Sequence, residues 1–241
     1  MFSVIFPGQG SQTVGMGKNI YDNYDYIKDL FEKADDILNF KLSEIILNGP
    51  KEKLDLTENT QPAIFLVSYC IFETIKRETI LNLNEAEYFA GHSLGEYSAL
   101  AASNSLTFED TIQLLKTRGQ SMQNALPKGE GGMLAILGEE INNISTLLNE
   151  NEKKYQCYIA NDNSNGQIVV SGKNKDIDLL VEDLKKNKIK NIKLPVSAPF
   201  HCELMSQATL KMRNIINEQS IILPKYNVVS NVSAIEYKSS E

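Results

Sequence analysis

Cysteine is scarce in this 241-residue sequence: Cys70, Cys157 and Cys202 are scattered, odd in number and without a C-x-x-C pair. Neither a disulfide framework nor a zinc site is expected, and a reducing cytoplasm suits such a chain. An excess of basic charge is lacking too, because 24 Lys and Arg stand against 31 Asp and Glu, for a net charge of -7. The chain therefore lacks the positive surface that nucleic-acid binding requires.

Long apolar runs are also missing. No stretch approaches the roughly 18 consecutive apolar residues from which a membrane-spanning helix is recognised. Residues 1–6 are apolar but break at once into Pro7-Gly8-Gln9-Gly10, without a basic segment or a cleavage site. We expect a first strand there, not a signal peptide. Together these absences predict a cytoplasmic protein that has no membrane partner.

The patterns that are present predict an α/β protein. With 42% hydrophobic residues the chain can bury a substantial core. Residues 2–6 and 88–90 resemble buried strands that lead into glycine-containing turns, whereas residues 21–40 carry apolar side chains at helical spacing. A second helix is expected from about Thr60, with Pro62 in its first turn. Strands that alternate with helices favour a parallel sheet covered by helices.

From about Leu126 the predicted order of elements changes to strand, helix, strand, strand, helix, strand. The six segments are residues 132–137, 141–149, 156–160, 167–171, 176–186 and 189–196. This β-α-β-β-α-β order is the ferredoxin-like pattern. We therefore predict a core formed by residues 1–125 and 198–241, with a ferredoxin-like subdomain of residues 126–197 inserted into it.

A candidate nucleophile lies in the G-x-S-x-G motif Gly91-His92-Ser93-Leu94-Gly95. The motif can also arise by coincidence, but here it falls where a predicted strand passes into a predicted helix. A nucleophile elbow needs that context, because flanking glycines relieve crowding at a sharp turn that exposes the serine. Ser93 is therefore the candidate nucleophile.

A serine nucleophile needs a general base, and the sequence has only two histidines. His92 precedes Ser93 directly, and on a sharp turn its side chain is expected to point elsewhere. His201 follows a predicted strand in a loop, where catalytic groups often lie, although a lone loop histidine can also be a packing residue. We predict that His201 is the base, which requires its imidazole to come within hydrogen-bonding distance of the Ser93 hydroxyl.

Several co-linear motifs resemble the malonyl-CoA:acyl-carrier-protein transacylases and the related acyltransferase domains of polyketide synthases. They are Phe6-Pro7-Gly8-Gln9-Gly10-Ser11-Gln12, Asn59-Thr60-Gln61-Pro62-Ala63, Gly91-His92-Ser93-Leu94-Gly95-Glu96-Tyr97-Ser98-Ala99-Leu100-Ala101-Ala102, Arg118-Gly119, Asn165-Gly166-Gln167-Ile168-Val169-Val170-Ser171-Gly172 and Pro199-Phe200-His201. The resemblance covers essentially the whole chain. It implies an α/β-hydrolase-like core with a ferredoxin-like insert, in agreement with the pattern of elements.

The resemblance also implies roles for individual residues. Ser93 would attack malonyl-CoA, His201 would move the proton, and the backbone N–H groups of Gln9 and Leu94 would form the oxyanion hole. From spacing alone, the turn that contains Gln9 is an ordinary tight turn. Acyl carrier protein would be the partner that accepts the malonyl group on its phosphopantetheine thiol. No cofactor or metal of the chain's own is implied.

Arg118 would set the substrate class, since a planar guanidinium can receive the free carboxylate of malonate through two parallel hydrogen bonds. Only three arginines occur in the chain, Arg77, Arg118 and Arg213. Without the resemblance, an arginine near a helix end next to Gly119 is as well explained by the helix dipole. With the resemblance, we expect Arg118 to recognise the carboxylate.

Family members continue beyond the part that corresponds to this chain, with a C-terminal segment that orients the catalytic histidine. A protein that ended at Glu241 would be weak or inactive, whereas a fragment of a longer chain would leave the prediction of activity unchanged. Two other classes remain open: a G-x-S-x-G hydrolase that uses water as acceptor, and an inactive module that binds carrier protein through the lysines of residues 185–193.

Overall fold

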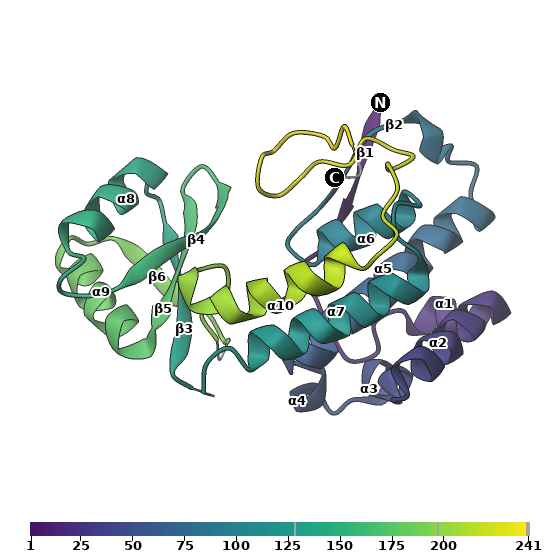
Figure 1. Cartoon of the computed structure of the whole chain (residues 1–241), viewed down its shortest axis with the longest axis horizontal. Coiled ribbons are helices and arrows are strands. Elements are labelled where there is room, and N and C mark those ends of the chain that lie inside the picture. The colour runs from purple at the N-terminus through teal and green to yellow at the C-terminus, as the bar shows by residue number, and fades with distance from the viewer. Residues whose placement is uncertain (128, 197, 240–241) are drawn as a thin grey trace. The chain divides into compact units, whose positions relative to one another are not determined.

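The computed structural model describes residues 1–127, 129–196 and 198–239. The chain divides into two compact units, a larger unit of Met1–Gln120 with Asn214–Glu241 and a smaller unit of Ser121–Arg213. The limits of the smaller unit fall within α7 (Phe108–Gln123) and α10 (Ser206–Asn217), both labelled in Figure 1. The predicted domains are 1–125 with 198–241, and 126–197. As in the structure, one domain is inserted between two segments of the other, but the predicted boundaries differ from those of the compact units. Residue 197 and residues 240–241 lie outside the described residues, and the division into domains stays a prediction.

The larger unit consists mainly of helices. In chain order its elements are β1 (Phe2–Phe6), α1 (Lys18–Asn23), α2 (Asp25–Leu38), α3 (Leu42–Asn48), α4 (Lys51–Leu54), α5 (Thr57–Glu78), the 3₁₀ helix η1 (Leu83–Glu85), β2 (Ala86–Gly91), α6 (Gly95–Ala102) and most of α7. The helix predicted over residues 21–40 is confirmed as α2, but its predicted start is wrong, because Tyr24 takes an extended conformation (φ -130°, ψ 120°) that separates α1 from α2.

β1 and β2 form the parallel sheet of the larger unit. Their register pairs Phe6, the last residue of β1, with Gly91, the last residue of β2. On the other side of β2, Val228 adds one parallel bridge to Phe89. The loops that follow both strands therefore leave from the same edge of the sheet, where α/β proteins place their functional residues.

The helical core of the larger unit follows from the spacing in α2. Ile27, Phe31 and Ala34 recur at intervals of four and three residues and are fully buried against residues of α5, among them Phe65. The ring of Phe65 lies 5.4 Å from that of Phe108 at the start of α7. This packing fixes α5 and α7, the two helices that carry polar residues toward the candidate site.

The smaller unit contains the six predicted elements in the predicted order. They are β3 (Gly131–Leu137), α8 (Ile141–Glu150), β4 (Cys157–Ser164), β5 (Gln167–Lys173), α9 (Asn174–Lys186) and β6 (Lys190–Lys193), followed by the 3₁₀ helix η2 (Glu203–Met205) and most of α10. The sheet order is β4-β5-β3-β6, and all neighbouring strands are antiparallel.

Alternating residues of β3 serve the two faces of this smaller sheet. Leu134 and Ile136 pack in one cluster with residues of α8 and α9, which cover one face in Figure 1. Met133 and Ala135 pack in a second cluster that includes Phe200. Because successive side chains of a strand point to opposite faces, one strand supports both clusters. The second cluster holds the loop that carries His201.

Candidate active site

Ser93 lies on a sharp turn between β2, which ends at Gly91, and α6, which begins at Gly95. Its φ angle of 54° is left-handed, a conformation that non-glycine residues seldom adopt and that costs energy. A Cβ atom on Gly91 would come within 1.9 Å of the Gly95 carbonyl carbon. A Cβ atom on Gly95 would come within 2.5 Å of the Phe6 carbonyl oxygen. The two glycines of the motif are therefore required by the tightness of the turn.

The loop after β1 packs on this turn. The His92 N–H donates to the Phe6 carbonyl oxygen over 3.0 Å, which ties the turn to the end of β1. A Cβ atom on Gly8 would come within 2.5 Å of His92 Nδ1, so the loop passes directly against the residue before the nucleophile. Gln9 follows at once. The parallel register thus places Gln9 and Ser93 at the same edge of the sheet.

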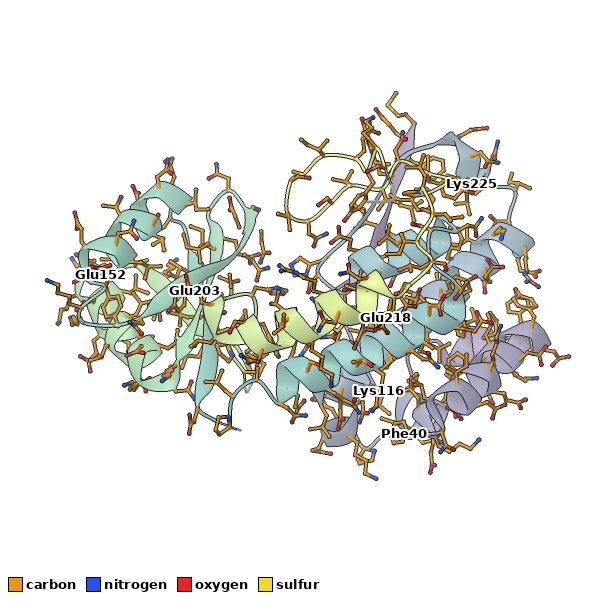
Figure 2. All side chains as sticks on the ribbon, viewed as in Figure 1. Phe40, Lys116, Glu152, Glu203, Glu218 and Lys225 are labelled. Carbon is orange, nitrogen blue, oxygen red and sulfur yellow. The ribbon has the colours of Figure 1, made fainter. Side chains whose placement is uncertain are left out.

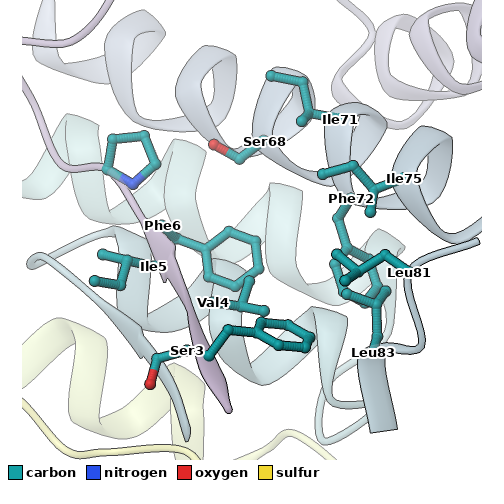
Figure 3. A pocket seen from close by; sticks show the side chains of 12 residues that line it. Ser3, Val4, Ile5, Phe6, Ser68, Ile71, Phe72, Ile75, Leu81 and Leu83 are labelled. Atoms are coloured by element: carbon teal, nitrogen blue, oxygen red, sulfur yellow. The ribbon is translucent and has the colours of Figure 1, made fainter. Parts of the chain in front are cut away.

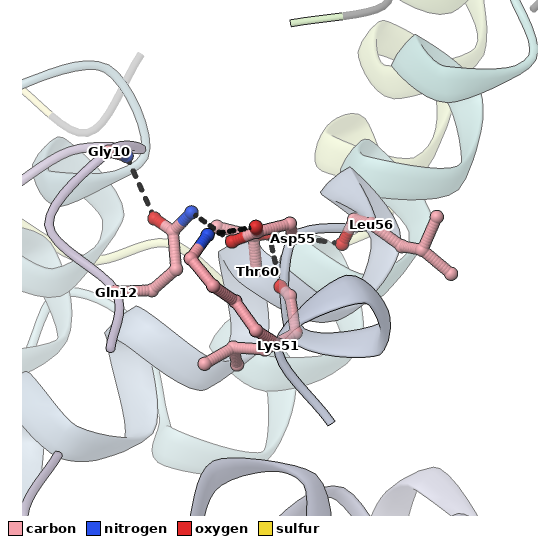
Figure 4. A network of polar contacts seen from close by, with 7 residues as sticks. Gly10, Gln12, Lys51, Asp55, Leu56 and Thr60 are labelled. Carbon is pink, nitrogen blue, oxygen red and sulfur yellow. Dashed lines mark hydrogen bonds and ion pairs between the residues drawn. The ribbon is translucent and has the colours of Figure 1, made fainter. Parts of the chain in front are cut away.

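A chain of polar contacts fixes the loop that carries Gln9, as Figure 4 shows. The Gly10 N–H donates to Gln12 Oε1 (2.8 Å), and Gln12 Nε2 donates to Asp55 Oδ1 (2.9 Å). The hydrogen bond from Gln12 and then the one from Lys51 lower the pKa of Asp55. Since Asp55 directly follows α4, these contacts anchor the loop to the helical part of the larger unit.

The two backbone N–H groups predicted to form an oxyanion hole are those of Leu94 and Gln9. Leu94 caps α6, and its side chain is buried, with 1% of its surface exposed. Within the described residues neither N–H group donates a hydrogen bond to the protein. Donors that are not engaged elsewhere suit the binding of a developing oxyanion. The role of the two groups stays a prediction.

The structure brings Arg118 to Ser93. Arg118 Nη2 donates to Ser93 Oγ over 3.1 Å, and Nη1 donates to Gln61 Oε1 over 2.8 Å. Its guanidinium also lies 5.7 Å from the ring centre of Tyr97. Burial lowers the pKa of Arg118, whereas the nearby Tyr97 and Glu96 raise it and so offset part of this effect. The site thus contains a desolvated cation beside the candidate nucleophile.

The close approach of α7 to the start of α5 explains how Arg118 reaches Gln61. A Cβ atom on Gly119 would lie 2.5 Å from the Thr57 carbonyl oxygen, so only glycine permits this approach. Lys116 lies three residues before Gly119 in α7. Its Nζ donates to Asn59 Oδ1 (3.0 Å) and lies 4.6 Å from the ring centre of Phe40. Lys116 and Phe40 are both labelled in Figure 2. Burial lowers the pKa of Lys116, as expected for a lysine held at a packed helix contact.

His201 lies in the smaller unit, in the loop that follows β6. Ser171 Oγ donates to the Phe200 carbonyl oxygen over 2.6 Å, and Phe200 itself is buried. Pro199 packs so closely on Gly131 that a Cβ atom there would lie 2.1 Å from Pro199 Cδ. His201 has a left-handed φ of 58°, the same unusual conformation as Ser93. Such outliers gather at functional sites, although the pairing of His201 with Ser93 stays a prediction.

Three residues of the site received no role from the sequence: Gln61, Tyr97 and Asn231. Gln61 and Tyr97 stood inside motifs, so their position in the chain was visible while their contacts were not. Asn231 was not singled out. Its side chain contacts the Ser93 turn from 138 positions away in the chain, and no local pattern signals such a contact.

The cavity beside β1 offers no acid or base to a second catalytic centre. This cavity of about 360 Å³ lies between β1, α5 and residues 81–83 (Figure 3). Its side chains are apolar apart from Ser3 and Ser68, so it offers no acid or base. Over the described ranges, no cluster of His, Cys, Asp and Glu could hold a metal ion. None of the helices searched there has both the length and the apolar character needed to cross a membrane.

Comparison with known proteins gives consistent results. The family described as "Acyl transferase domain" matches residues 3–241. The chain is 43% identical over 232 residues to a malonyl CoA-acyl carrier protein transacylase of Bacillus subtilis (strain 168). The aligned part covers 95% of this chain and 72% of that protein. It is 39% identical over 236 residues to the protein of the same name from Staphylococcus aureus (strain MRSA252), with 96% and 74% covered.

Solved structures agree. A crystal structure of an acyl-carrier-protein-S-malonyltransferase from Bartonella henselae matches with a TM-score of 0.94 at 39% identity, covering 100% of this chain and 77% of that one. A malonyl-transacylase in complex with a type II PKS acyl-carrier protein matches with a TM-score of 0.93 at 32% identity, covering 99% and 77%. In fold this chain is a mixed α/β protein of the same kind.

Proposed function

Because the chain belongs to the family of acyl transferase domains, we propose that it transfers a malonyl group from malonyl-CoA to the phosphopantetheine thiol of acyl carrier protein. This reaction supplies fatty-acid elongation. The observation that carries the proposal is the 3.1 Å hydrogen bond from Arg118 Nη2 to Ser93 Oγ. It puts a cation that can bind a free carboxylate beside a hydroxyl that can be acylated.

In the first half-reaction, Ser93 Oγ attacks the thioester carbonyl of malonyl-CoA, and His201 takes the hydroxyl proton. The N–H groups of Leu94 and Gln9 stabilise the oxyanion of the tetrahedral intermediate. The C–S bond then breaks, and the departing sulfur of coenzyme A receives the proton from His201. The products are malonyl-Ser93 and free coenzyme A.

In the second half-reaction, the phosphopantetheine thiol of acyl carrier protein loses its proton to His201 and attacks malonyl-Ser93. The ester C–O bond breaks, and Ser93 Oγ regains the proton. Once Ser93 is acylated, Arg118 binds the malonyl carboxylate in place of the Ser93 hydroxyl, because its side chain offers several donors in one plane. Since the first product leaves before the second substrate reacts, the kinetics are ping-pong.

The proposal includes the finer fold assignment. We propose that the larger unit is an α/β-hydrolase-like core, which is supported by the parallel pair β1 and β2 and by the turn at Ser93. We propose that the smaller unit is a ferredoxin-like subdomain, which is supported by its element order and its sheet order β4-β5-β3-β6. The transfer needs no resident cofactor, and we place the reaction in the cytoplasm.

Mass spectrometry of the intact protein tests the function. After addition of malonyl-CoA, we expect a malonyl adduct that disappears when phosphopantetheine-loaded acyl carrier protein is added. Ser93→Ala should form no adduct. Rapid release of free malonate without carrier protein would instead identify a hydrolase, and a wild-type chain that never forms an adduct would refute the transfer reaction.

Ser98→Ala is the matched control. Ser98 lies in α6, five residues after Ser93 in the chain, and its Oγ is buried without a hydrogen-bond partner in the described residues. Removal of an unpaired buried hydroxyl is expected to leave the fold intact. Ser98→Ala should therefore form the adduct as the wild type does, which shows that the effect is specific to position 93.

A further inference from the structure

Residues 227–229 run alongside β2 toward the nucleophile turn. The Phe89 N–H donates to the Asn227 carbonyl oxygen, and the Val229 N–H donates to the Phe89 carbonyl oxygen, both over 2.9 Å. The bridge between Phe89 and Val228 is parallel. Because the segment runs in the direction of β2, the residues that follow it leave at the same edge as Gly91. Asn231, two residues after Val229, lies at that edge.

The side-chain amide of Asn231 contacts the backbone on both sides of His92. Its Nδ2 donates to the Gly91 carbonyl oxygen over 2.6 Å. Its Oδ1 accepts from the Ser93 N–H over 2.7 Å. One planar group therefore holds the two peptide units that flank His92, and the second of these leads directly into the left-handed residue Ser93.

Glu96 holds Asn231 in place. The Asn231 N–H donates to Glu96 Oε1 over 3.2 Å, and Tyr237 Oη donates to the same oxygen over 2.5 Å. Glu96 is in the first turn of α6, directly after the nucleophile turn. Desolvation, followed by the hydrogen bond to Glu96, raises the pKa of Tyr237 to about 12. Tyr237 therefore remains a hydrogen-bond donor over the neutral range.

We propose that Asn231 is a positioning residue for Ser93: its amide locks the strained turn so that Ser93 Oγ and the Leu94 N–H keep the geometry needed for acylation. The inference rests on the proposed function, since it assigns a role within that reaction. A left-handed non-glycine residue persists only when its surroundings determine it, and here two hydrogen bonds from one side chain do so. Asn231 acts through the backbone and touches no reacting atom.

The chain offers a matched comparison in Asn227. Its Nδ2 donates to the Glu87 carbonyl oxygen over 3.2 Å. Asn227 thus makes the same kind of bond, from the same segment to the same strand, away from the turn. If side-chain amides only attach this segment to β2, loss of either one should have the same effect. If Asn231 positions Ser93, only its loss should slow acylation.

The experiment measures the acylation burst by rapid quench and intact mass, with saturating malonyl-CoA. The rate constant reports the geometry of Ser93, whereas the amplitude reports the folded fraction. For Asn231→Ala we expect the rate constant to fall about 10- to 100-fold, as for small misplacements of reacting groups, with the amplitude preserved. For Asn227→Ala we expect the wild-type rate constant.

Asn231→Asp separates hydrogen bonding from packing, because it keeps the size of the side chain but loses the donor to Gly91. We expect slow acylation in this variant as well, and faster deuterium exchange of residues 91–94 in both Asn231 variants than in Asn227→Ala. A wild-type rate constant in Asn231→Asp would overturn the inference, as would a lowered amplitude with unchanged rate constant in Asn231→Ala. A wild-type protein without any burst would instead refute the proposed function.

Discussion

At Arg118 one guanidinium is shared between a fixed partner and a replaceable one. Gln61 Oε1 accepts from Arg118 Nη1 at 2.8 Å. Because only 1% of the Gln61 surface is exposed, this partner holds the arginine in place. Ser93 Oγ accepts from Nη2 at 3.1 Å and is the group that we propose becomes acylated. Once Ser93 is an ester, a carboxylate on the acyl group can take over the freed donors. We therefore propose that selection for malonyl depends on Arg118.

We predict that Arg118→Ala lowers malonyl transfer and spares acetyl transfer. Hydrogen bonds to charged groups contribute about 1.5 to 3 kcal/mol, so the ratio of malonyl to acetyl kcat/KM should fall by about 10- to 150-fold. Parallel assays with the two acyl-CoA substrates measure the ratio. Lys116→Ala is the control, because Lys116 anchors the same helix to Asn59 without contacting Ser93. An equal loss on both substrates would contradict the assignment.

At the scale of elements, β1, β2 and α6 cross at the two glycines of the nucleophile turn. Gly91 and Gly95 are in contact with each other, and Gly95 also touches the last residue of β1. No side chain fits at either position. The turn is therefore part of the packing of the sheet as well as the carrier of Ser93.

We predict that Gly91→Ala both destabilises the protein and abolishes acylation. Its Cβ would come within 1.9 Å of backbone that cannot move freely, so the cost should reach or exceed the upper end of the about 1 to 3 kcal/mol typical of overpacking. Urea denaturation and the intact-mass assay measure the two effects. Gly166→Ala is the comparison, since its Cβ would meet no atom closer than 3.6 Å. Gly166→Ala should lower the free energy of unfolding only by the strain of a positive φ angle and should leave acylation unchanged.

At the scale of the whole molecule, stability at alkaline pH reports how well the buried tyrosine hydroxyls are shielded from water. Burial raises the pKa of Tyr69, Tyr155 and Tyr237 to about 12 from an ordinary value of 10.0. Above pH 10 the unfolded chain loses these protons first, whereas the folded chain keeps them until about pH 12. The stability that the neutral hydroxyls provide is thus fully present below pH 10 and is lost as pH rises toward 12.

We predict that the free energy of unfolding is steady from pH 7 to 9 and declines between pH 10 and 12. Tyr155→Phe should reduce this decline without loss of stability at pH 8, because the Tyr155 hydroxyl is buried and has no hydrogen-bond partner in the described residues. Urea titrations at each pH measure both quantities. An alkaline decline of wild-type size in Tyr155→Phe would show that this hydroxyl is not protected from ionisation.

The sequence by itself determined the local elements on which the site is built. A short apolar strand, two glycines around a serine and an alanine-rich helix predict a sharp turn at Ser93. Alternating and helical spacing likewise gave the six elements of the smaller unit in order. The start of α5 was misplaced, because Pro62 stands in its second turn, six residues into Thr57–Glu78, and not in its first. α7 was not assigned, since polar and weakly helix-forming residues such as Thr111, Thr117 and Gly119 interrupt its apolar pattern.

Only the tertiary structure decided which side chains meet at Ser93. Arg118 reaches it because Gly119 lets α7 approach α5, and Asn231 reaches it because residues 227–229 lie beside β2. Contacts between residues 25 and 138 positions apart leave no periodic trace in a sequence, since they depend on how complete elements pack. The chemistry of each group could be read from its residue type, whereas the partner of each group was fixed by the packing.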